Sequence, residues 1–325
     1  MRFITQRLAH SLFVLWAVVT ILFLMFRLMP GDPMAAYISE ALPEESQNAI
    51  RQQFGLDKPL WQQYLIYLTN LARGELGMSF HARQPVIAIL LAALPNTVVL
   101  TMSGLVVAYA FGIVAGAFLA WKRGTWIEGI AIPVVLGTRA APEFWVGMVL
   151  LAIFSFHLGW FPSGGANSAG MFYASEWQRM LSLDFLRHLT LPALTLALYL
   201  QGLPLLLMRS TMLEVMHEDF VTMARMKGFS EWRIVLAHAA RNALLPVVTA
   251  FALSFGALIG GNVVVELVFS WPGLGRILVN AVLASDYPVA QGAFFLVALA
   301  LIAMNFIADV LYAILDPRVS HVGAG

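Results

Sequence analysis

Residues 96–121, NTVVLTMSGLVVAYAFGIVAGAFLAW, contain no charged side chain, and this stretch decides the fold. An apolar run of about 20 residues is long enough to cross a bilayer as an α-helix. No water is available in the hydrocarbon core, so the backbone of such a run must satisfy its own hydrogen bonds by forming a helix. Only 11% of the chain is charged, whereas soluble domains carry about 25% charged residues. The sequence therefore predicts an all-α, polytopic membrane protein.

Five further apolar stretches lie before and after this run, and they predict a protein with six transmembrane helices. The six predicted spans are residues 11–29, 96–121, 126–157, 189–208, 244–269 and 289–315. Two of them contain internal prolines, Pro133 and Pro142 in the third and Pro192 and Pro204 in the fourth. Prolines inside membrane helices predict kinks within one bundle. The first stretch is longer than a signal-peptide core and lacks an Ala-x-Ala-like cleavage site, so we interpret it as an uncleaved span.

The basic residues near the span ends predict the orientation. An even number of spans places both termini on one side, together with several short basic segments. These residues are Arg2, Arg7, Lys122, Arg123, Arg209 and Arg318. Because short cytoplasmic loops carry the excess of Lys and Arg, both termini are expected in the cytoplasm.

A long loop separates the first two spans and divides the chain. We expect residues 1–95 to form the first transmembrane helix and an outer loop, residues 96–316 a core of five helices, and residues 317–325 a short cytoplasmic tail. The stretch 61–71 is amphipathic and predicts a short helix in the loop. A loop of this length has a function of its own or packs as a small subdomain. A cap over the bundle and direct handling of substrate remain alternatives.

Residues 214–241 carry eight charged side chains and cannot be a span. Glu218 and Asp219 begin a predicted short helix that ends on Arg225 and Lys227, an order that complements the helix dipole. Gly228 follows where a C-terminal cap is expected, and a second helix restarts after it.

This segment has two possible physical uses. An amphipathic helix between spans lies on the lipid surface or fills a groove on another protein. Met223 belongs to its apolar face, and its charges are balanced with an acidic start. An interfacial helix prefers a basic polar face, so the pattern favours a protein partner.

Several motifs in a fixed order give the chain a family resemblance. They are EDFVTMARMKG at 218–228, HAARNALLP at 238–246, PGDP at 30–33, FGLDKP at 54–59, GELG at 74–77 and FSWPGLG at 269–275. Together they resemble binding-protein-dependent ABC permeases, specifically the dipeptide, oligopeptide and nickel branch and the permease with the long first periplasmic loop. The resemblance covers nearly the whole chain and implies the type I ABC importer permease fold in a bacterial inner membrane.

The resemblance also implies the mechanism. In the family, the loop at 214–241 is a coupling segment that inserts into a nucleotide-binding subunit, which places Glu218, Asp219, Met223, Ala224 and Gly228 at the contact. Ala224 and Gly228 match the family's small residue and glycine, whereas Thr222 stands where the wider family has glutamate. The expected partners are a second, related permease, two ATP-binding cassette subunits that bind ATP and Mg, a periplasmic substrate-binding protein and membrane lipid. The expected solute is a di- or oligopeptide, with nickel, glutathione, an opine or an oligosaccharide as alternatives.

Other classes of function lack their residues. None of the three lysines follows a glycine, so a phosphate-binding loop is missing and this chain is expected to bind no cofactor. The chain has no cysteine and no histidine pair with metal-ligand spacing. No long basic run favours nucleic acid. A polytopic membrane enzyme is the rival class, and a passive channel would not need the coupling segment.

Three charged residues near or within spans are candidates for a substrate path. Arg139 and Glu143 are four residues apart in the third predicted span and should share a helix face. A charge at mid-bilayer is costly, so they either form an internal ion pair or line a polar passage. Glu266 precedes the FSWPGLG loop, where it either lines the outer mouth or bonds to the loop backbone. Asp309 and Asn305 are expected to bond to neighbouring helices.

Overall fold

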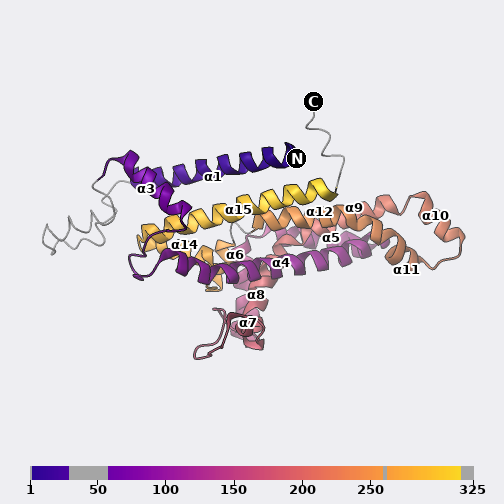
Figure 1. The fold of residues 1–325 in the computed structure, drawn as a ribbon. Helices are drawn as coiled ribbons and strands as arrows, with labels where there is room; N and C mark the ends of the chain where they lie inside the picture. Colours follow the sequence, from indigo (N-terminus) through magenta and orange to yellow (C-terminus); the bar gives the residue numbers. More distant parts are fainter. Residues whose placement is uncertain (1, 29–57, 259–261, 316–325) are drawn as a thin grey trace.

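The computed structural model describes residues 2–28, 58–258 and 262–315. Within these ranges the regular structure is helical, apart from an isolated bridge between Met78 and Pro85. Most helices lie side by side in an elongated bundle, with α3 at one end and α10 and α11 at the other (Figure 1). The α-helices are α1 Arg2–Leu28, α3 Leu60–Ala72, α4 Val86–Trp121, α5 Trp126–Ala140, α6 Glu143–Leu150, α7 Glu176–Met180, α8 Leu183–Leu200, α9 Gly202–Val215, α10 Asp219–Met226, α11 Glu231–Arg233, α12 Ala240–Leu258, α13 Val263–Val268, α14 Leu274–Leu283 and α15 Tyr287–Leu315. Two π-helical stretches, η1 Leu151–His157 and η2 Ile234–Ala239, extend α6 and join α11 to α12.

The predicted number of spans agrees with the helices that are long and apolar enough to cross a membrane. Among the described residues these are the segments Thr5–Leu28, Val86–Trp121, Glu231–Phe251 and Tyr287–Ile307, and two bent pairs of helices bring the number to six if each pair is one span. The start of α1 and the end of α15 both point toward the end of the bundle that carries α10 and α11 (Figure 1).

The third predicted span is broken, which is more than the kink we expected. α5 and α6 meet at an angle of 104°. Ala141, between them, is extended, with φ −71° and ψ 139°. Proline disfavours a helical conformation in the residue before it and lacks the N–H that would continue the ladder. Pro142 therefore ends α5, whereas Pro133 lies inside it.

Other span boundaries also differ from the prediction. α4 begins at Val86, ten residues before the predicted start at 96, and passes through Pro95, the expected end of the outer loop. The predicted fifth span, 244–269, extends over both α12 and the separate short helix α13, with 259–261 outside the described residues. α13 packs one face against the protein, where Val265 and Glu266 are buried, and leaves Val264 and Leu267 exposed.

Close contact between α4 and the bent pair α8–α9 forms the centre of the bundle. A Cβ at Gly112 would lie 2.9 Å from the backbone N of Leu205, and a Cβ at Gly104 would lie 2.6 Å from Cβ of Leu196. Small residues at a membrane-helix interface let two backbones approach and pack by van der Waals contact.

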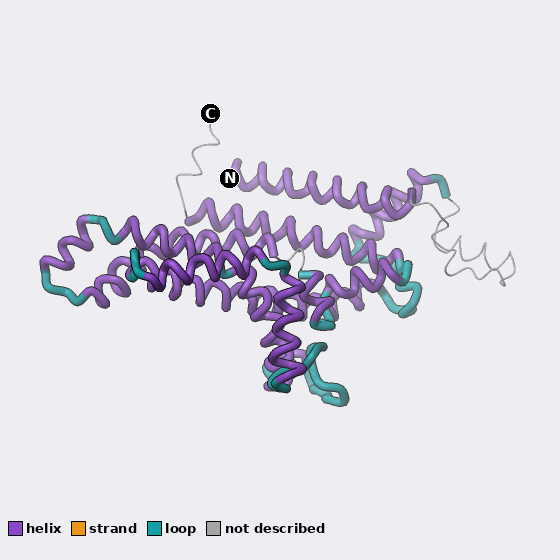
Figure 2. Tube along the Cα trace, turned by 180° about the vertical axis from the view of Figure 1, so that it is seen from behind, coloured by secondary structure: helices purple, strands orange, loops and turns teal. Residues whose placement is uncertain are grey.

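One part of the structure projects from the side of the bundle. α7 and the beginning of α8 lie there with their connecting loops (Figures 1 and 2). α8 and α9 are bent by 47° where they meet, at Gln201. The two bent pairs thus give the bundle its sideways extension.

Candidate functional site

Residues 218–239, which we call the docking hairpin after the role that the sequence predicts for it, stand at one end of the bundle and have the two short helices that the sequence predicts. Glu218 is extended and precedes α10, which ends at Met226. Gly228 then turns the chain with φ +79°, a left-handed conformation that glycine adopts without steric cost. Ser230 is extended before α11, but its side chain makes no capping hydrogen bond.

A small apolar core holds the docking hairpin closed. Val221, Ala224 and Ile234 are buried, and Phe220 and Phe229 pack against them. Ala224 is only 6% exposed, so its small side chain fits between α10 and η2 of its own chain. The exposed face of α10 does not include Ala224.

The opposite face of α10 carries exposed apolar side chains. Met223 is 56% exposed and Met226 is 81% exposed. Residues three apart lie on the same side of a helix, so these two thioether side chains form one surface. Glu218 and Asp219 are also exposed at the start of the helix. A Cβ added at Gly228 would meet nothing within 4 Å in the described structure.

Aromatic contacts attach the docking hairpin to the bundle. Trp232 of α11 meets Trp121 at the end of α4, with ring centroids 5.7 Å apart at 63°. The ammonium of Lys122 lies 4.3 Å from the Trp121 ring centroid. Within the hairpin itself, Phe229 stacks on His238 with centroids 5.6 Å apart. Sequence reasoning did not identify this attachment, although Trp121 at the end of the second predicted span was a visible signal.

The turn between α4 and α5 is fixed at the same end. The Gly124 backbone N–H donates to Glu128 Oε2 at 2.6 Å, and Glu128 forms an ion pair with Arg209 of α9. Lys122 and Arg209, which the orientation argument placed on one side, therefore both lie at the end of the bundle that carries the docking hairpin.

The two bent helix pairs touch at their bends. Gln201 Nε2 donates to Thr138 Oγ1 at 3.1 Å. Next to this contact, a Cβ at Gly202 would lie 3.5 Å from Cδ of Arg139. The bend of α8–α9 thus packs beside the end of α5.

Our expectation that Arg139 and Glu143 share a helix face is wrong. The break before Pro142 places Arg139 in α5 and Glu143 at the start of α6, so four-residue helical spacing does not apply. The structure contains no ion pair between these two described residues. Arg139 is exposed, and Glu143 is half-buried.

Glu266 lies at the other end of the bundle, in the outer cluster, which we define as Asn96, Thr97, Glu266 and the loop 269–276. Its side chain is 0% exposed. Thr97 Oγ1 donates to Glu266 Oε1 at 2.6 Å, and the Arg276 backbone N–H donates to Oε2 at 2.9 Å. A Cβ at Gly273 would collide with the Glu266 carboxylate. Glu266 thus bonds to the loop backbone, one of the two arrangements expected for it.

The outer cluster also ties α4 to the same loop through Asn96. Asn96 Nδ2 donates to the Pro272 carbonyl at 2.9 Å, and Trp271 Nε1 donates to the Asn96 carbonyl at 3.0 Å. Arg179 of α7 donates to Asn96 Oδ1 at 2.7 Å. Sequence reasoning did not select Asn96 or Thr97, although both are polar residues in an apolar span.

A second carboxylate, Asp286, binds the outer loop segment that precedes α4. Ser79 Oγ donates to Asp286 Oδ2 at 2.5 Å, and the backbone N–H groups of Phe80 and His81 each donate to Asp286 at 3.2 Å. These contacts join segments about 200 residues apart. No motif in the sequence indicates this pairing.

Two further polar contacts join helices to one another. Asp309 forms an ion pair with Arg7 of α1 at 3.0 Å, which confirms the expectation that it bonds to a neighbouring helix. Ser254 shares a 2.8 Å hydrogen bond with the Tyr109 hydroxyl. Within 2–28, 58–258 and 262–315, no group of three acidic, histidine or cysteine side chains could hold a metal ion.

These features define a polytopic membrane subunit with a helical hairpin exposed at one end. Two family profiles match the sequence. The profile described as "Binding-protein-dependent transport system inner membrane component" matches residues 112–321, and the one described as "Binding-prot-dependent transport system membrane comp, N-term" matches residues 1–101.

Characterised relatives match along nearly their whole length. The chain is 39% identical to the di/tripeptide transport system permease protein DppB of Pseudomonas aeruginosa strain UCBPP-PA14, with 98% of each chain covered. It is 36% identical to the glutathione transport system permease protein GsiC of Escherichia coli strain K12, with 99% of each covered. The chain therefore belongs to the family of binding-protein-dependent ABC permeases.

Proposed function

We propose that the docking hairpin is the surface through which an ATP-hydrolysing subunit drives transport by this permease. The observation that supports this most directly is the exposed pair Met223 and Met226 on a helix whose other face is already packed. Methionine side chains adapt to an irregular partner groove. Burying one such side chain contributes about 1.5–3 kcal/mol, so this pair would supply affinity.

The remaining candidate contact residues have different roles in this proposal. Glu218 and Asp219 form the exposed acidic start of α10 and meet polar groups at the rim of the partner groove. Ala224 keeps the two halves of the hairpin together, and Gly228 allows the turn between them. The contact to the partner thus consists of apolar and acidic side chains of α10.

The proposed assembly contains this chain, a second related permease, two ATP-binding cassette subunits and a periplasmic substrate-binding protein. The cassettes bind ATP and Mg and carry out hydrolysis, so this chain is not an enzyme. The docking hairpin faces the cytoplasm of a bacterium, together with both termini. The membership of the family and the basic residues at that end of the bundle support this orientation.

The proposed solute is a di- or oligopeptide, which accords with the peptide-handling names of the relatives. Nickel, glutathione, an opine or an oligosaccharide is the alternative cargo of the same machinery. Arg139 and Glu143 are the proposed polar groups of the path, because both lie near the touching bends, with Arg139 exposed and Glu143 half-buried. Glu266 is proposed to hold the loop 269–276 beside the path.

The docking proposal can be tested by co-purification. The double substitution Met223→Asp and Met226→Asp should abolish retention of ATPase subunits and ATP-driven peptide uptake in liposomes. Met171→Asp is the matched control, since Met171 is another exposed methionine, far from the hairpin. Unchanged retention in the double variant, or uptake in liposomes without any ATPase subunit, would contradict the proposal.

A further inference from the structure

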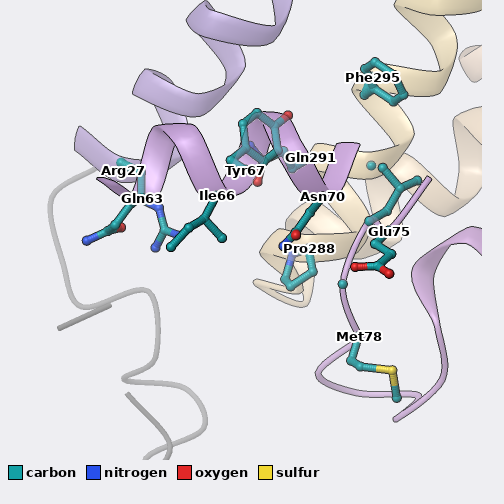
Figure 3. A pocket seen from close by; sticks show the side chains of 13 residues that line it. Arg27, Gln63, Ile66, Tyr67, Asn70, Glu75, Met78, Pro288, Gln291 and Phe295 are labelled. Carbon is teal, nitrogen blue, oxygen red and sulfur yellow. The ribbon is translucent and has the colours of Figure 1, made fainter. Parts of the chain in front are cut away.

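A pocket of about 160 Å³ lies at the end of the bundle opposite the docking hairpin. The end of α1, one side of α3, the segment 75–78 and the beginning of α15 enclose it (Figure 3). Since a water occupies about 30 Å³ of liquid, the pocket has room for a group several times larger. It is separate from the outer cluster, with which it shares no lining residue.

Two buried polar atoms in this pocket have no hydrogen-bond partner among the described residues. They are Gln63 Oε1 and the Tyr67 hydroxyl. Gln63 is 9% exposed, and its Nε2 donates to the Lys58 carbonyl at 2.7 Å, which leaves Oε1 as a free acceptor. Gln291 lies close to the Tyr67 hydroxyl without completing a hydrogen bond. Buried polar groups in native proteins have partners, so each unpaired one requires an explanation.

The neighbouring Tyr64 has a hydrogen-bond partner for its hydroxyl, whereas Tyr67 has none among the described residues. The Tyr64 hydroxyl shares a 2.7 Å hydrogen bond with Thr20 of α1. Tyr67 instead stacks on Phe23 at 5.6 Å, which fixes its ring at the pocket. Burial raises the pKa of Tyr67 to about 12, so its phenol stays neutral at neutral pH and can accept as well as donate a hydrogen bond.

The charges of the pocket have opposite signs and lie apart. Arg27 and Glu75 lie at opposite ends of the view in Figure 3, with Tyr67 and Asn70 between them. No ion pair engages either charge in the described part of the chain. Such an arrangement suits a zwitterion, with an anionic group at the guanidinium and a protonated amine toward the carboxylate.

The position of α3 indicates where this zwitterion comes from. α3 lies beside the end of α1 (Figure 1) and exposes Leu60, Trp61 and Leu65. An amphipathic helix with a tryptophan at the end of a span is typical of the headgroup region of a bilayer. The pocket is therefore at the depth of lipid head groups.

We propose that this pocket binds the head group of a zwitterionic phospholipid with a primary amine, such as phosphatidylethanolamine. The phosphate lies at Arg27, and the amine donates hydrogen bonds toward Glu75 and the polar side chains between the two charges. Ile66, Met78 and Phe295 provide apolar walls for the glycerol and acyl carbons. The pocket requires no ATPase partner and thus goes beyond the proposed docking function.

The test uses the full-length chain in nanodiscs of phosphatidylcholine with a small fraction of phosphatidylethanolamine or phosphatidylglycerol of the same acyl chains. Native mass spectrometry then measures the lipid retained on the protein. We expect phosphatidylethanolamine to be retained about tenfold over phosphatidylcholine, whose amine has no N–H, and over phosphatidylglycerol, which has no amine. Tyr67→Phe and Glu75→Gln should each remove most of this preference.

Two controls keep the result interpretable. Tyr67→Phe removes an unpaired polar atom and should leave the fold intact. Arg73→Gln changes an exposed charge beside Glu75 that does not line the pocket, and it should leave the preference unchanged. Equal retention of the three lipids, or a preference that survives both pocket variants, would overturn the proposal. If free phosphoethanolamine at equal concentration displaced the lipid, the ligand of the pocket would be the free head group and not a membrane lipid.

Discussion

The outer cluster and the docking hairpin lie at opposite ends of one bundle. Each contains a short connecting segment, and the two are stabilised in different ways. In the outer cluster, Glu266 and Trp271 are completely buried, and side chains from α4 bond to the loop. In the docking hairpin, the core is small, with Val221, Ala224 and Ile234 buried under two phenylalanines, and the ion pair of Arg225 with Glu231 is exposed. The loop 269–276 is covered by side chains of this chain, whereas the hairpin leaves Met223 and Met226 exposed, as the docking proposal requires.

This difference has an energetic basis. A buried carboxylate is tolerated only when hydrogen bonds replace its hydration, so each partner of Glu266 is expensive to remove. Exposed methionines contribute nothing until a partner covers them. Substitutions in the outer cluster should therefore affect the stability of the chain, and those in the hairpin should affect assembly.

The largest effect is expected for Gly273→Ala in the outer cluster. The added methyl group would collide with the Glu266 carboxylate and break its bonds to Thr97 and Arg276. Overpacking costs about 1–3 kcal/mol, and a buried charge that loses its partners about 3–5 kcal/mol. We expect a loss of at least about 3 kcal/mol, measured as a lower thermal unfolding midpoint in detergent.

Gly129→Ala provides the matched control for that substitution. A Cβ at Gly129 would meet nothing within 4 Å, and alanine favours the helix over glycine. It should leave the midpoint unchanged or raise it. An equal decrease of the unfolding midpoint in both variants would show that the outer cluster is no more sensitive to an added methyl group than α5.

The second prediction concerns the turn in the docking hairpin. Gly228→Val places a β-branched side chain at φ +79°, which costs about 1–2 kcal/mol or more. Asparagine tolerates this conformation, so Gly228→Asn should retain the ATPase subunits while Gly228→Val loses them. Co-purification measures both. Loss in both variants would instead indicate that the partner backbone approaches Gly228 closely.

The apolar runs and the loop motifs allowed much of this structure to be predicted. The absence of charge in 96–121 predicted a span because the bilayer requires a helix there. Gly228 predicted the turn between α10 and α11 because few other residues adopt a positive φ without strain. Both arguments depend on local chemistry, and both predictions are confirmed.

Features that depend on tertiary contacts could not be predicted in the same way. The sequence shows that Pro142 disfavours a helix, but the 104° angle also depends on how α5 and α6 pack against α8. Asp286 binds Ser79 across about 200 residues, and no local pattern encodes such a pairing. Ala224 fitted the family motif, yet only the fold shows that it packs inside the hairpin.

The third prediction tests the attachment of the docking hairpin to the bundle. Trp232→Ala removes the contact with Trp121, and an aromatic pair contributes about 0.5–1.5 kcal/mol beyond its buried area. Amides of α10 and α11 should exchange with deuterium faster, while those of α4 near the outer cluster keep their rates. Trp232→Phe retains a ring and should have a smaller effect. Faster exchange along the whole of α4 would show that the two ends are not independent.

The smallest effect is expected for the exposed ion pair of the docking hairpin. Arg225 Nε lies 2.9 Å from Glu231 Oε1, and surface ion pairs contribute about 0–1 kcal/mol. A double-mutant cycle with Arg225→Ala and Glu231→Ala should give a coupling free energy in that range for hydrogen exchange of the hairpin. The coupling should decrease at 1 M salt, where screening acts over about 3 Å. A coupling above about 2 kcal/mol that salt does not reduce would mean that polar contacts stabilise this hairpin as strongly as the outer cluster. The contrast between the two ends would then fail.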